Sequence, residues 1–194
     1  MTVIYMLRHA QTNNNLEKLW HGSKTGPLNN TGIMQAEFIG QRMKDFAIDA
    51  ILSSDSERAI ETARIVSDKI GAPLVRKDPI FGERHFGGAE DLTSAEISRR
   101  YGITVANVLD EGIDRIPEAE SIHSLESRVK EAMDFICTIF PGKTVLVTSH
   151  GGFVRMFYRT FAGDVNGKYF TNCSYYSIEC TEKAHRIRDD LFNP

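Results

Sequence analysis

The sequence predicts a layered α/β domain with a mainly parallel central sheet, and three observations lead to this expectation. An apolar, β-rich run over residues 2–7 ends abruptly in Arg8 and His9. A second run of this kind, 144–149, ends in His150 and is followed by two glycines and a helical pattern. Further runs of this type alternate with amphipathic helices along the chain, which is the pattern of a layered α/β fold.

Each element follows from local periodicity and from the turn formers that bound it. The expected strands cover about 2–8, 49–53, 74–75, 144–149, 175–180 and 185–188. The expected helices cover about 32–46, 55–70, 94–101, 124–140 and 153–161. Residues 15–30 and 78–92 are expected to be irregular, and the acidic segment 103–122 is expected to be a helix-containing insertion. No repeat or linker interrupts the pattern, so residues 1–194 are expected to form one domain.

Capping residues mark where three of these helices should begin. Thr31 offers a side-chain oxygen to the first helix. Ser54 with Glu57, and Thr93 with Glu96, have the spacing of a capping box, in which each side chain bonds the other residue's backbone. These signals place the second helix directly after the strand 49–53.

Composition narrows the classes of function. The chain has a net charge of −3 and no basic stripe, which argues against nucleic acid as a partner. No apolar run is long enough to span a bilayer, and the first residues lack the pattern of a signal peptide, so we expect no membrane partner and a cytoplasmic protein. The three cysteines, Cys137, Cys173 and Cys180, lack metal-type spacing and are expected to be reduced thiols.

Basic side chains should gather at one edge of the sheet. Ligands of open α/β sheets bind outside the carboxyl ends of the strands, where Arg8, His9 and His150 are expected. Arg58 is expected on the first turn of the helix that starts at the same edge. Two guanidiniums and two imidazoles would form an anion site, because arginine matches the oxygens of phosphate in bidentate geometry.

Such a site can transfer a phosphoryl group without a metal. A neutral His9 can attack phosphorus directly, and the nearby positive charges disfavour its protonation. Arg8, Arg58 and a protonated His150 would then stabilise the oxygens of the transferring group. The six histidines show no paired ligand spacing, so we expect neither a metal nor another cofactor.

The leaving alcohol also needs a proton. Glu83 is the preferred donor, because it lies in a glycine-bearing loop after the third expected strand. Asp55, Asp78 and Glu90 remain as rivals from sequence reasoning alone.

At these residues the sequence resembles the histidine phosphatase superfamily, also called the phosphoglycerate mutase-like family. The matching blocks occur in the family's order over nearly the whole chain: Arg8-His9-Ala10-Gln11-Thr12 with Asn15, Pro27-Leu28 with Gly32, Gln35 and Ala36, Ser53-Ser54-Asp55 with Arg58, Ala59, Thr62 and Ala63, Glu83 with Phe86-Gly87, and Ser149-His150-Gly151-Gly152.

The resemblance implies a three-layer α/β/α sandwich and a role for each site residue. His9 would be the phosphorylated nucleophile and Glu83 the proton donor, with Arg8, Arg58 and His150 completing the catalytic set. The substrate-binding residues implied by the resemblance are Arg8, Asn15, Arg58, His150 and Gly151.

Three residues depart from the family pattern. Ala10 replaces the usual glycine after the nucleophile, which adds a methyl group and is expected to narrow the pocket. Gln11 replaces a common glutamate, and Ala119 stands where a glycine usually precedes the pair Glu120-Ser121. None of the three removes a catalytic group.

The resulting expectation is a metal-independent phosphomonoesterase, a histidine acid-type phosphatase that acts on a small phosphorylated metabolite. The alternatives are a cofactor-dependent phosphoglycerate mutase, whose family members usually have longer chains, and a non-catalytic phosphate-binding regulatory protein. The physiological substrate stays open, because the loops that shape specificity cannot be built from sequence. The oligomeric state also stays open, with a homodimer as one option.

Overall fold

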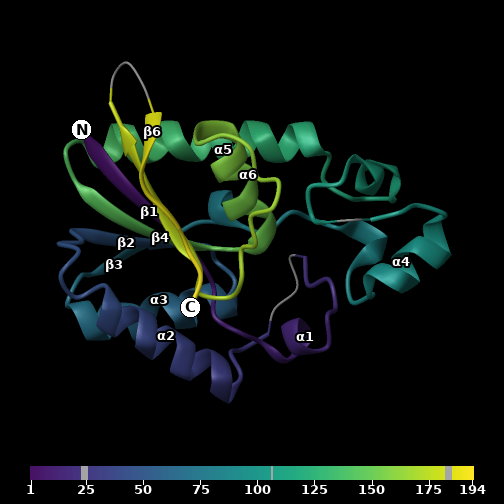
Figure 1. The fold of residues 1–194 in the computed structure, drawn as a ribbon, viewed down its shortest axis with the longest axis horizontal. Helices are drawn as coiled ribbons and strands as arrows, with labels where there is room; N and C mark the ends of the chain where they lie inside the picture. Colours follow the sequence, from purple (N-terminus) through teal and green to yellow (C-terminus); the bar gives the residue numbers. More distant parts are fainter. Residues whose placement is uncertain (23–25, 106, 182–184) are drawn as a thin grey trace.

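The computed structural model describes residues 1–22, 26–105, 107–181 and 185–194, and a six-stranded sheet forms its centre (Figure 1). The strands are β1 (Thr2–Arg8), β2 (Ala50–Ser53), β3 (Leu74–Lys77), β4 (Thr144–Ser149), β5 (Tyr175–Cys180) and β6 (His185–Phe192). The α-helices are α1 (Asn13–Leu16), α2 (Asn30–Arg42), α3 (Glu57–Ile70), α4 (Ser94–Tyr101), α5 (Ile122–Ile139) and α6 (Gly151–Phe161). Short 3-10 turns are η1 (Pro79–Phe81), η2 (Gly87–Ala89) and η3 (Glu111–Arg115).

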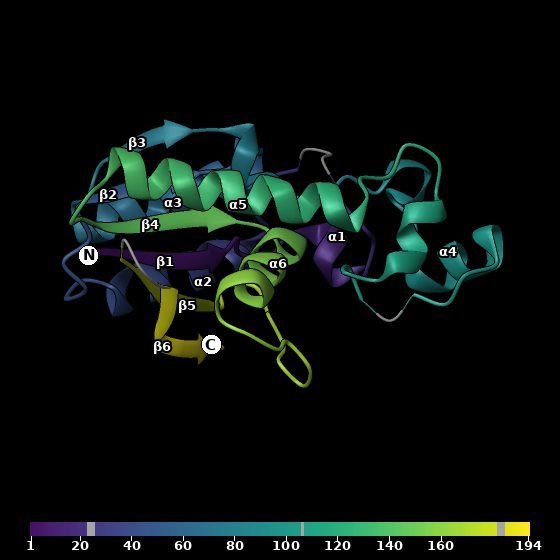
Figure 2. The ribbon, with the colours of Figure 1, turned by 90° about the horizontal axis from the view of Figure 1, so that it is seen from above.

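The sheet is buried on both faces, which makes the fold a three-layer α/β/α sandwich. Successive residues of β1 alternate between the faces: Ile4 and Met6 pack with α5 and α6, whereas Tyr5 and Leu7 pack with α2 and α3. Figures 1 and 2 show these helix pairs on opposite sides of the strands. The predicted fold class is confirmed, since near-continuous apolar strands have this two-sided burial.

Strand pairing places the predicted site at one edge. The order is β3-β2-β4-β1-β5-β6, in which β1 to β4 run parallel and β5 and β6 are antiparallel additions. Arg8 at the end of β1 is in register with Ser149 at the end of β4, and Ser53 at the end of β2 is in register with Thr148. The residues that follow these three strands therefore lie side by side.

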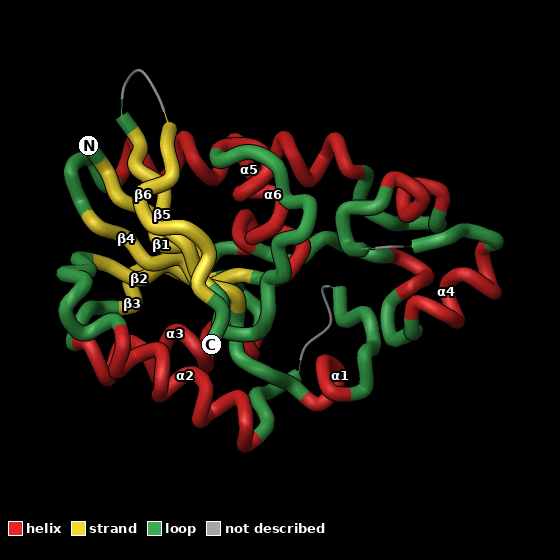
Figure 3. The backbone as a smooth tube through the Cα atoms, viewed as in Figure 1, coloured by secondary structure: helices red, strands yellow, loops and turns green. Residues whose placement is uncertain are grey.

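Residues 84–105 and 107–120 form a lobe beside this edge, most of it without regular structure (Figure 3). Its own apolar cluster is centred on Phe86, Ile97 and Ile113. The buried Arg84 side chain donates to the carbonyls of Val108 and Asp110, and its Nη2 lies 2.5 Å from Asp114 Oδ1. The segment 103–122 was predicted to be an insertion that contains helix. Among its described residues before α5, the helical structure is the 3-10 turn η3.

Two predicted helix starts were wrong. Helix α2 is capped by Asn29, whose side chain accepts the Gly32 N–H, and Thr31 lies inside the helix. The N-cap of α3 is Ser56, because the Ser54 hydroxyl contacts His150 and accepts the Ser56 N–H instead of forming a capping box. The capping box of Thr93 and Glu96 is confirmed at α4.

The loop predicted over 15–30 begins with a short helix, because α1 covers Asn13–Leu16. Its cap is Thr12, whose side chain accepts the Asn15 N–H, while the Asn15 side chain accepts the Thr12 N–H. Residues 23–25 of this loop lie outside the described part of the chain.

The expectation of three reduced thiols is corrected by the structure. Cys137 of α5 and Cys180 of β5 form a disulfide, and Cys173 is a buried free thiol. Sequence spacing could not reveal the pair, since the two residues meet only when α5 packs across the sheet. Among the described helices, none combines the length and apolarity needed to cross a bilayer.

Candidate active site

The structure brings the predicted basic residues together at the carboxyl edge of the sheet. His9 follows β1, His150 follows β4, and Arg58 lies on the first turn of α3. All three side chains are buried, with 3% or less of their surface exposed. The two imidazole rings are 5.1 Å apart, and Arg58 Nε lies 3.3 Å from His9 Nε2.

A backbone hydrogen bond sets the tautomer of His9. Its Nδ1 lies 2.7 Å from the carbonyl oxygen of Ala10, which can only accept a hydrogen bond, so Nδ1 carries the proton. The lone pair is then on Nε2, where it accepts from Arg58 Nε. His9 therefore presents Nε2 as a nucleophile.

His150 presents the other ring nitrogen. Its Nε2 lies 2.8 Å from the Ser54 hydroxyl and 3.2 Å from the Ser56 hydroxyl, and either hydroxyl can donate to it. When a hydroxyl donates to Nε2, the His150 proton is on Nδ1, a buried atom with no hydrogen-bond partner in the described structure. Nδ1–H is then a free donor inside the site.

Burial keeps both imidazoles neutral in the unliganded protein. Desolvation lowers the pKa of His9 well below its ordinary value, and the charges of Arg58 and Arg8 lower it further. The pKa of His150 is lowered in the same way, by burial first and by Arg58 and His9 next. The pKa shift thus favours a neutral His150 over the protonated ring expected from the sequence.

Each of the two arginines is held by a backbone carbonyl. Arg8 Nη1 donates to the carbonyl of Phe170 at 2.5 Å, and Arg58 Nη2 donates to the carbonyl of Gly22 at 2.8 Å. Arg8 Nε is buried without a hydrogen-bond partner. Burial lowers the pKa of Arg58 to about 10, which still leaves it charged at neutral pH, and burial also lowers the pKa of Arg8.

Glu83 lies at the N-terminus of α6. Its Oε1 accepts the Gly152 N–H at 2.9 Å and the Arg84 N–H at 2.8 Å. A methyl group on Gly152 would come within 2.4 Å of Oε1, so the close approach requires glycine. These two backbone N–H groups hold the Glu83 carboxyl group in place.

Asn15 is oriented by a neighbour that the sequence did not reveal. Its Oδ1 accepts from the Thr12 N–H and from Asn172 Nδ2, at 3.2 and 3.0 Å. The Asn172 amide also donates to the carbonyl of His9 at 3.0 Å. With Oδ1 occupied, the Asn15 NH₂ group is left to face the cavity that Asn15 lines.

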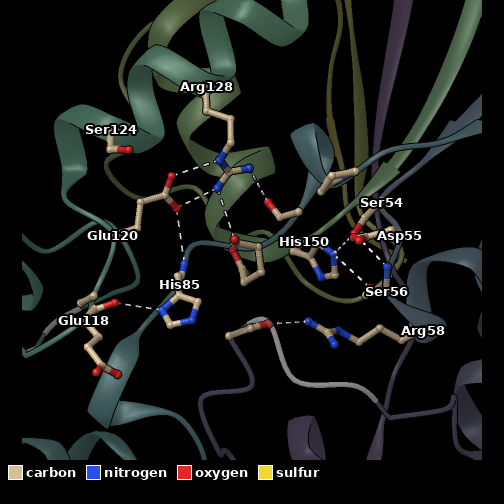
Figure 4. Close-up of a pocket in the computed structure, with 15 residues that line it drawn as sticks. Ser54, Asp55, Ser56, Arg58, His85, Glu118, Glu120, Ser124, Arg128 and His150 are labelled. Atoms are coloured by element: carbon tan, nitrogen blue, oxygen red, sulfur yellow. Dashed lines mark hydrogen bonds and ion pairs between the residues drawn. The ribbon is translucent and has the colours of Figure 1, made fainter.

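Two cavities meet at Arg58 and Glu83, which line both of them. The larger cavity, of about 780 Å³, contains Arg8, His9, Asn15 and Gly151. The smaller cavity, of about 530 Å³, contains His150 and is shown in Figure 4. The six residues predicted to surround the phosphate thus border one continuous site, and so does the predicted proton donor, Glu83.

The rivals of Glu83 are placed less favourably. Asp78 accepts the Ile80 N–H and pairs with Arg76, and it borders neither cavity. Glu90 also borders neither cavity. Asp55 borders only the smaller cavity, on the His150 side.

Ala10 does not narrow the site. It packs in the apolar cluster between the sheet and α2 and borders neither cavity. Its φ is not in the left-handed region, so its backbone does not require glycine. Gln11 lines the larger cavity, and its amide oxygen accepts from Asn29.

Sequence reasoning missed several polar contacts of the site. They are the Ser54 hydroxyl on His150, the Gly22 carbonyl on Arg58 and the Asn172 amide on the carbonyl of His9. His21 is buried beside Thr12, and desolvation lowers its pKa to about 4. In the described part of the chain, no cluster of three or more His, Cys, Asp or Glu residues is arranged for a metal.

Comparisons with known proteins point to one family. The model of the histidine phosphatase superfamily (branch 1) matches residues 4–189. An "Uncharacterized phosphatase PhoE" of Bacillus subtilis (strain 168) is 30% identical over 196 residues, covering 100% of this chain and 96% of that protein. A "Probable phosphoglycerate mutase GpmB" of Yersinia pestis (strain Pestoides F) is 34% identical over 156 residues, which cover 78% of this chain and 70% of that protein. The structure of Bacillus stearothermophilus YhfR matches with a TM-score of 0.83 at 25% identity, covering 98% of this chain and 96% of that one.

Proposed function

The chain belongs to branch 1 of the histidine phosphatase superfamily, and from this membership we propose that it is a metal-independent phosphomonoesterase of the histidine acid type. Its substrate is a small phosphorylated metabolite, and the reaction passes through a phosphohistidine on His9. Residues 1–194 act as one domain. The named phosphatase relative and the site geometry both support this proposal.

One observation carries the proposal: the site of the His9 nucleophile also holds two buried polar atoms without partners. These atoms are Arg8 Nε and His150 Nδ1, and the charges of Arg58 and Arg8 both act on His9. A buried donor without a partner costs roughly 1–3 kcal/mol. A phosphate group would satisfy both donors and place its phosphorus next to the nucleophile.

The first half of the proposed reaction transfers the phosphoryl group to the enzyme. The His9 Nε2 lone pair forms a bond to phosphorus while the bond from phosphorus to the ester oxygen breaks. Arg8, Arg58 and the His150 Nδ1–H stabilise the phosphoryl oxygens, and Asn15 and the backbone at Gly151 complete the pocket. Glu83 gives its proton to the departing oxygen, so the product leaves as a neutral alcohol.

The second half returns the enzyme to its starting state. Glu83, now a carboxylate, takes a proton from water as the water oxygen bonds to phosphorus. The bond from phosphorus to His9 Nε2 breaks, and the lone pair returns to the imidazole. Inorganic phosphate is released, and Glu83 again carries a proton.

The test is phosphate release from a panel of phosphomonoesters in excess chelator, comparing the wild type with His9→Ala. The wild type should turn over in chelator, and His9→Ala should lose at least about 10³-fold in kcat while remaining folded, because the covalent route requires the imidazole. Acid-labile ³²P on the wild type and its absence on the variant would identify the intermediate. Equal turnover of the two proteins would rule out the mechanism.

A phosphoglycerate mutase is the second candidate, because the chain is 34% identical to a protein named as a probable mutase. A mutase would interconvert 2- and 3-phosphoglycerate only after priming by bisphosphoglycerate. Transfer faster than hydrolysis in that assay would move the assignment to the mutase.

A further inference from the structure

We propose, on the basis of the proposed function, that Arg128 is a positioning residue. It holds the segment that carries Glu83 so that Glu83 can protonate the leaving group, and Glu120 holds Arg128 in place. Neither residue touches His9 or the proposed phosphate donors in the described structure. Both line the smaller cavity, as Glu83 does, and Figure 4 shows their side chains paired there.

Glu83 lies outside the described strands and helices, so no β-ladder or helix satisfies its backbone groups. Gly82 ends the 3-10 turn η1, and Glu83 connects it to the lobe. Ser149 Oγ binds the carbonyl of Phe81, and the Gly152 N–H binds the Glu83 carboxyl group. The carbonyls of Ile80, Gly82 and Glu83 still need partners from side chains or water.

Arg128 supplies these partners, and so anchors the segment, from the middle of α5. Its Nη1 donates to the carbonyls of Ile80 and Gly82 at 3.0 and 2.8 Å. Its Nη2 donates to the carbonyl of Glu83 at 3.2 Å. One guanidinium thus binds three carbonyls in a run of four residues and keeps two further N–H donors, whereas an ammonium group has only three donors in all.

Glu120 fixes the guanidinium from the opposite side. Its Oε1 accepts from Arg128 Nε at 3.0 Å and its Oε2 accepts from Nη2 at 2.8 Å, a bidentate pair that is largely buried. The next residue, Ser121, caps α5 and so fixes the helix that carries Arg128. This arrangement explains why Glu120 and Ser121 stand together in the sequence.

The proposal can be tested through the leaving group. p-Nitrophenolate departs as a stable anion and needs little help from an acid, whereas the alkoxide of glycerol phosphate must be protonated. Loss of the Glu83 position should therefore affect glycerol phosphate selectively. The quantity to compare is kcat/KM, because it covers the steps up to departure of the alcohol and excludes hydrolysis of the phosphohistidine.

Arg128→Met should lower kcat/KM for glycerol phosphate by about 10²-fold and for p-nitrophenyl phosphate by less than about threefold. Glu83→Gln should show the same selectivity with a larger loss. Arg128→Lys should recover part of the glycerol phosphate activity, since it restores one charge and some of the donors. Lys130→Met is the matched control, because it removes an exposed cation from the same helix that pairs only with Glu126 among the described residues.

Glu120→Gln keeps the shape of the anchor and covers the case in which Arg128→Met fails to fold. It should give a weaker form of the same selective loss. If these variants lower kcat/KM for both esters equally, the positioning role is overturned and the proposed function stands. If the wild type hydrolyses neither ester, the proposed function fails and this inference fails with it.

Discussion

His9 and His150 carry their proton on the same ring nitrogen but present opposite nitrogens to the site. His9 gives its Nδ1–H to the carbonyl of Ala10 and exposes the Nε2 lone pair. His150 accepts from Ser54 at Nε2 and exposes an unpaired Nδ1–H. Two chemically identical side chains thereby become a nucleophile and a donor, because different neighbours occupy the other nitrogen.

The residue identities of this site could be predicted from sequence, but their protonation could not. The change from apolar to polar residues at the end of each strand indicates His9 and His150 as site residues. The neutral state of His150 depends on complete burial beside Arg58, a contact between segments distant in the chain. The same holds for Asn172, whose contacts with His9 and Asn15 span more than 150 residues.

Ala10→Gly tests whether the alanine after the nucleophile is a packing residue. The methyl group is buried in the apolar cluster, so its loss should destabilise the protein by about 1–2 kcal/mol through lost burial and added chain entropy. The backbone contacts of Ala10 with Thr62 and His9 remain, so kcat should change by less than about twofold. Urea denaturation and phosphate release measure the two effects.

Ala47→Gly is the matched control, because Ala47 has a φ of 50° and carries the strain of the left-handed region. The same substitution there should stabilise the protein by up to about 1 kcal/mol. A gain in activity with Ala10→Gly and no loss of stability would show that the methyl group does narrow the site.

At the scale of elements, strands were predicted more accurately than helix ends. The strand 175–180 and the central strand 144–149 have the expected bounds, because each is a nearly continuous run of residues that are buried in the sheet. The start of α3 shifted because Ser54 has a stronger partner in His150 than in the helix backbone. A capping signal in the sequence therefore mispredicts the start of a helix when the capping side chain forms a tertiary hydrogen bond instead.

Thr93→Ala tests the capping box that did form. Thr93 Oγ1 accepts the Glu96 N–H, and the Thr93 N–H donates to Glu96 Oε2 at 2.8 Å. Loss of the hydroxyl should cost about 1 kcal/mol of stability in urea denaturation. Thr93→Ser keeps the oxygen and should retain most of that stability, and equal losses in both variants would mean that the methyl group, not the cap, matters.

At the scale of the whole molecule, the fold concentrates buried imidazoles where the sheet ends. His9, His21 and His150 are all less than 10% exposed. Burial and nearby arginines lower the pKa of His9 and of His150 well below the ordinary value, and burial lowers that of His21 to about 4. These histidines are thus neutral in the folded protein at mildly acidic pH, whereas they would be protonated in the unfolded chain.

This arrangement predicts that stability falls as the pH falls below about 6.5, the ordinary histidine pKa. Above that value both states are neutral and the contribution is fully present. Below it the unfolded chain binds protons that the folded protein does not, so each buried histidine removes about 1.4 kcal/mol of unfolding free energy per pH unit until its folded pKa is reached. Urea denaturation between pH 7.5 and 5 measures the slope.

His21→Gln removes one of the three imidazoles without touching the proposed catalytic set, so the slope between pH 6 and 5 should become shallower by about one third. His123→Gln, which removes an exposed imidazole from α5, is the matched control for the loss of a ring. A wild-type unfolding free energy that stays flat from pH 7.5 to 5 would mean that the folded protein takes up these protons. The nucleophile would then be protonated in mild acid, and the pH profile of phosphate release would fall over the same range.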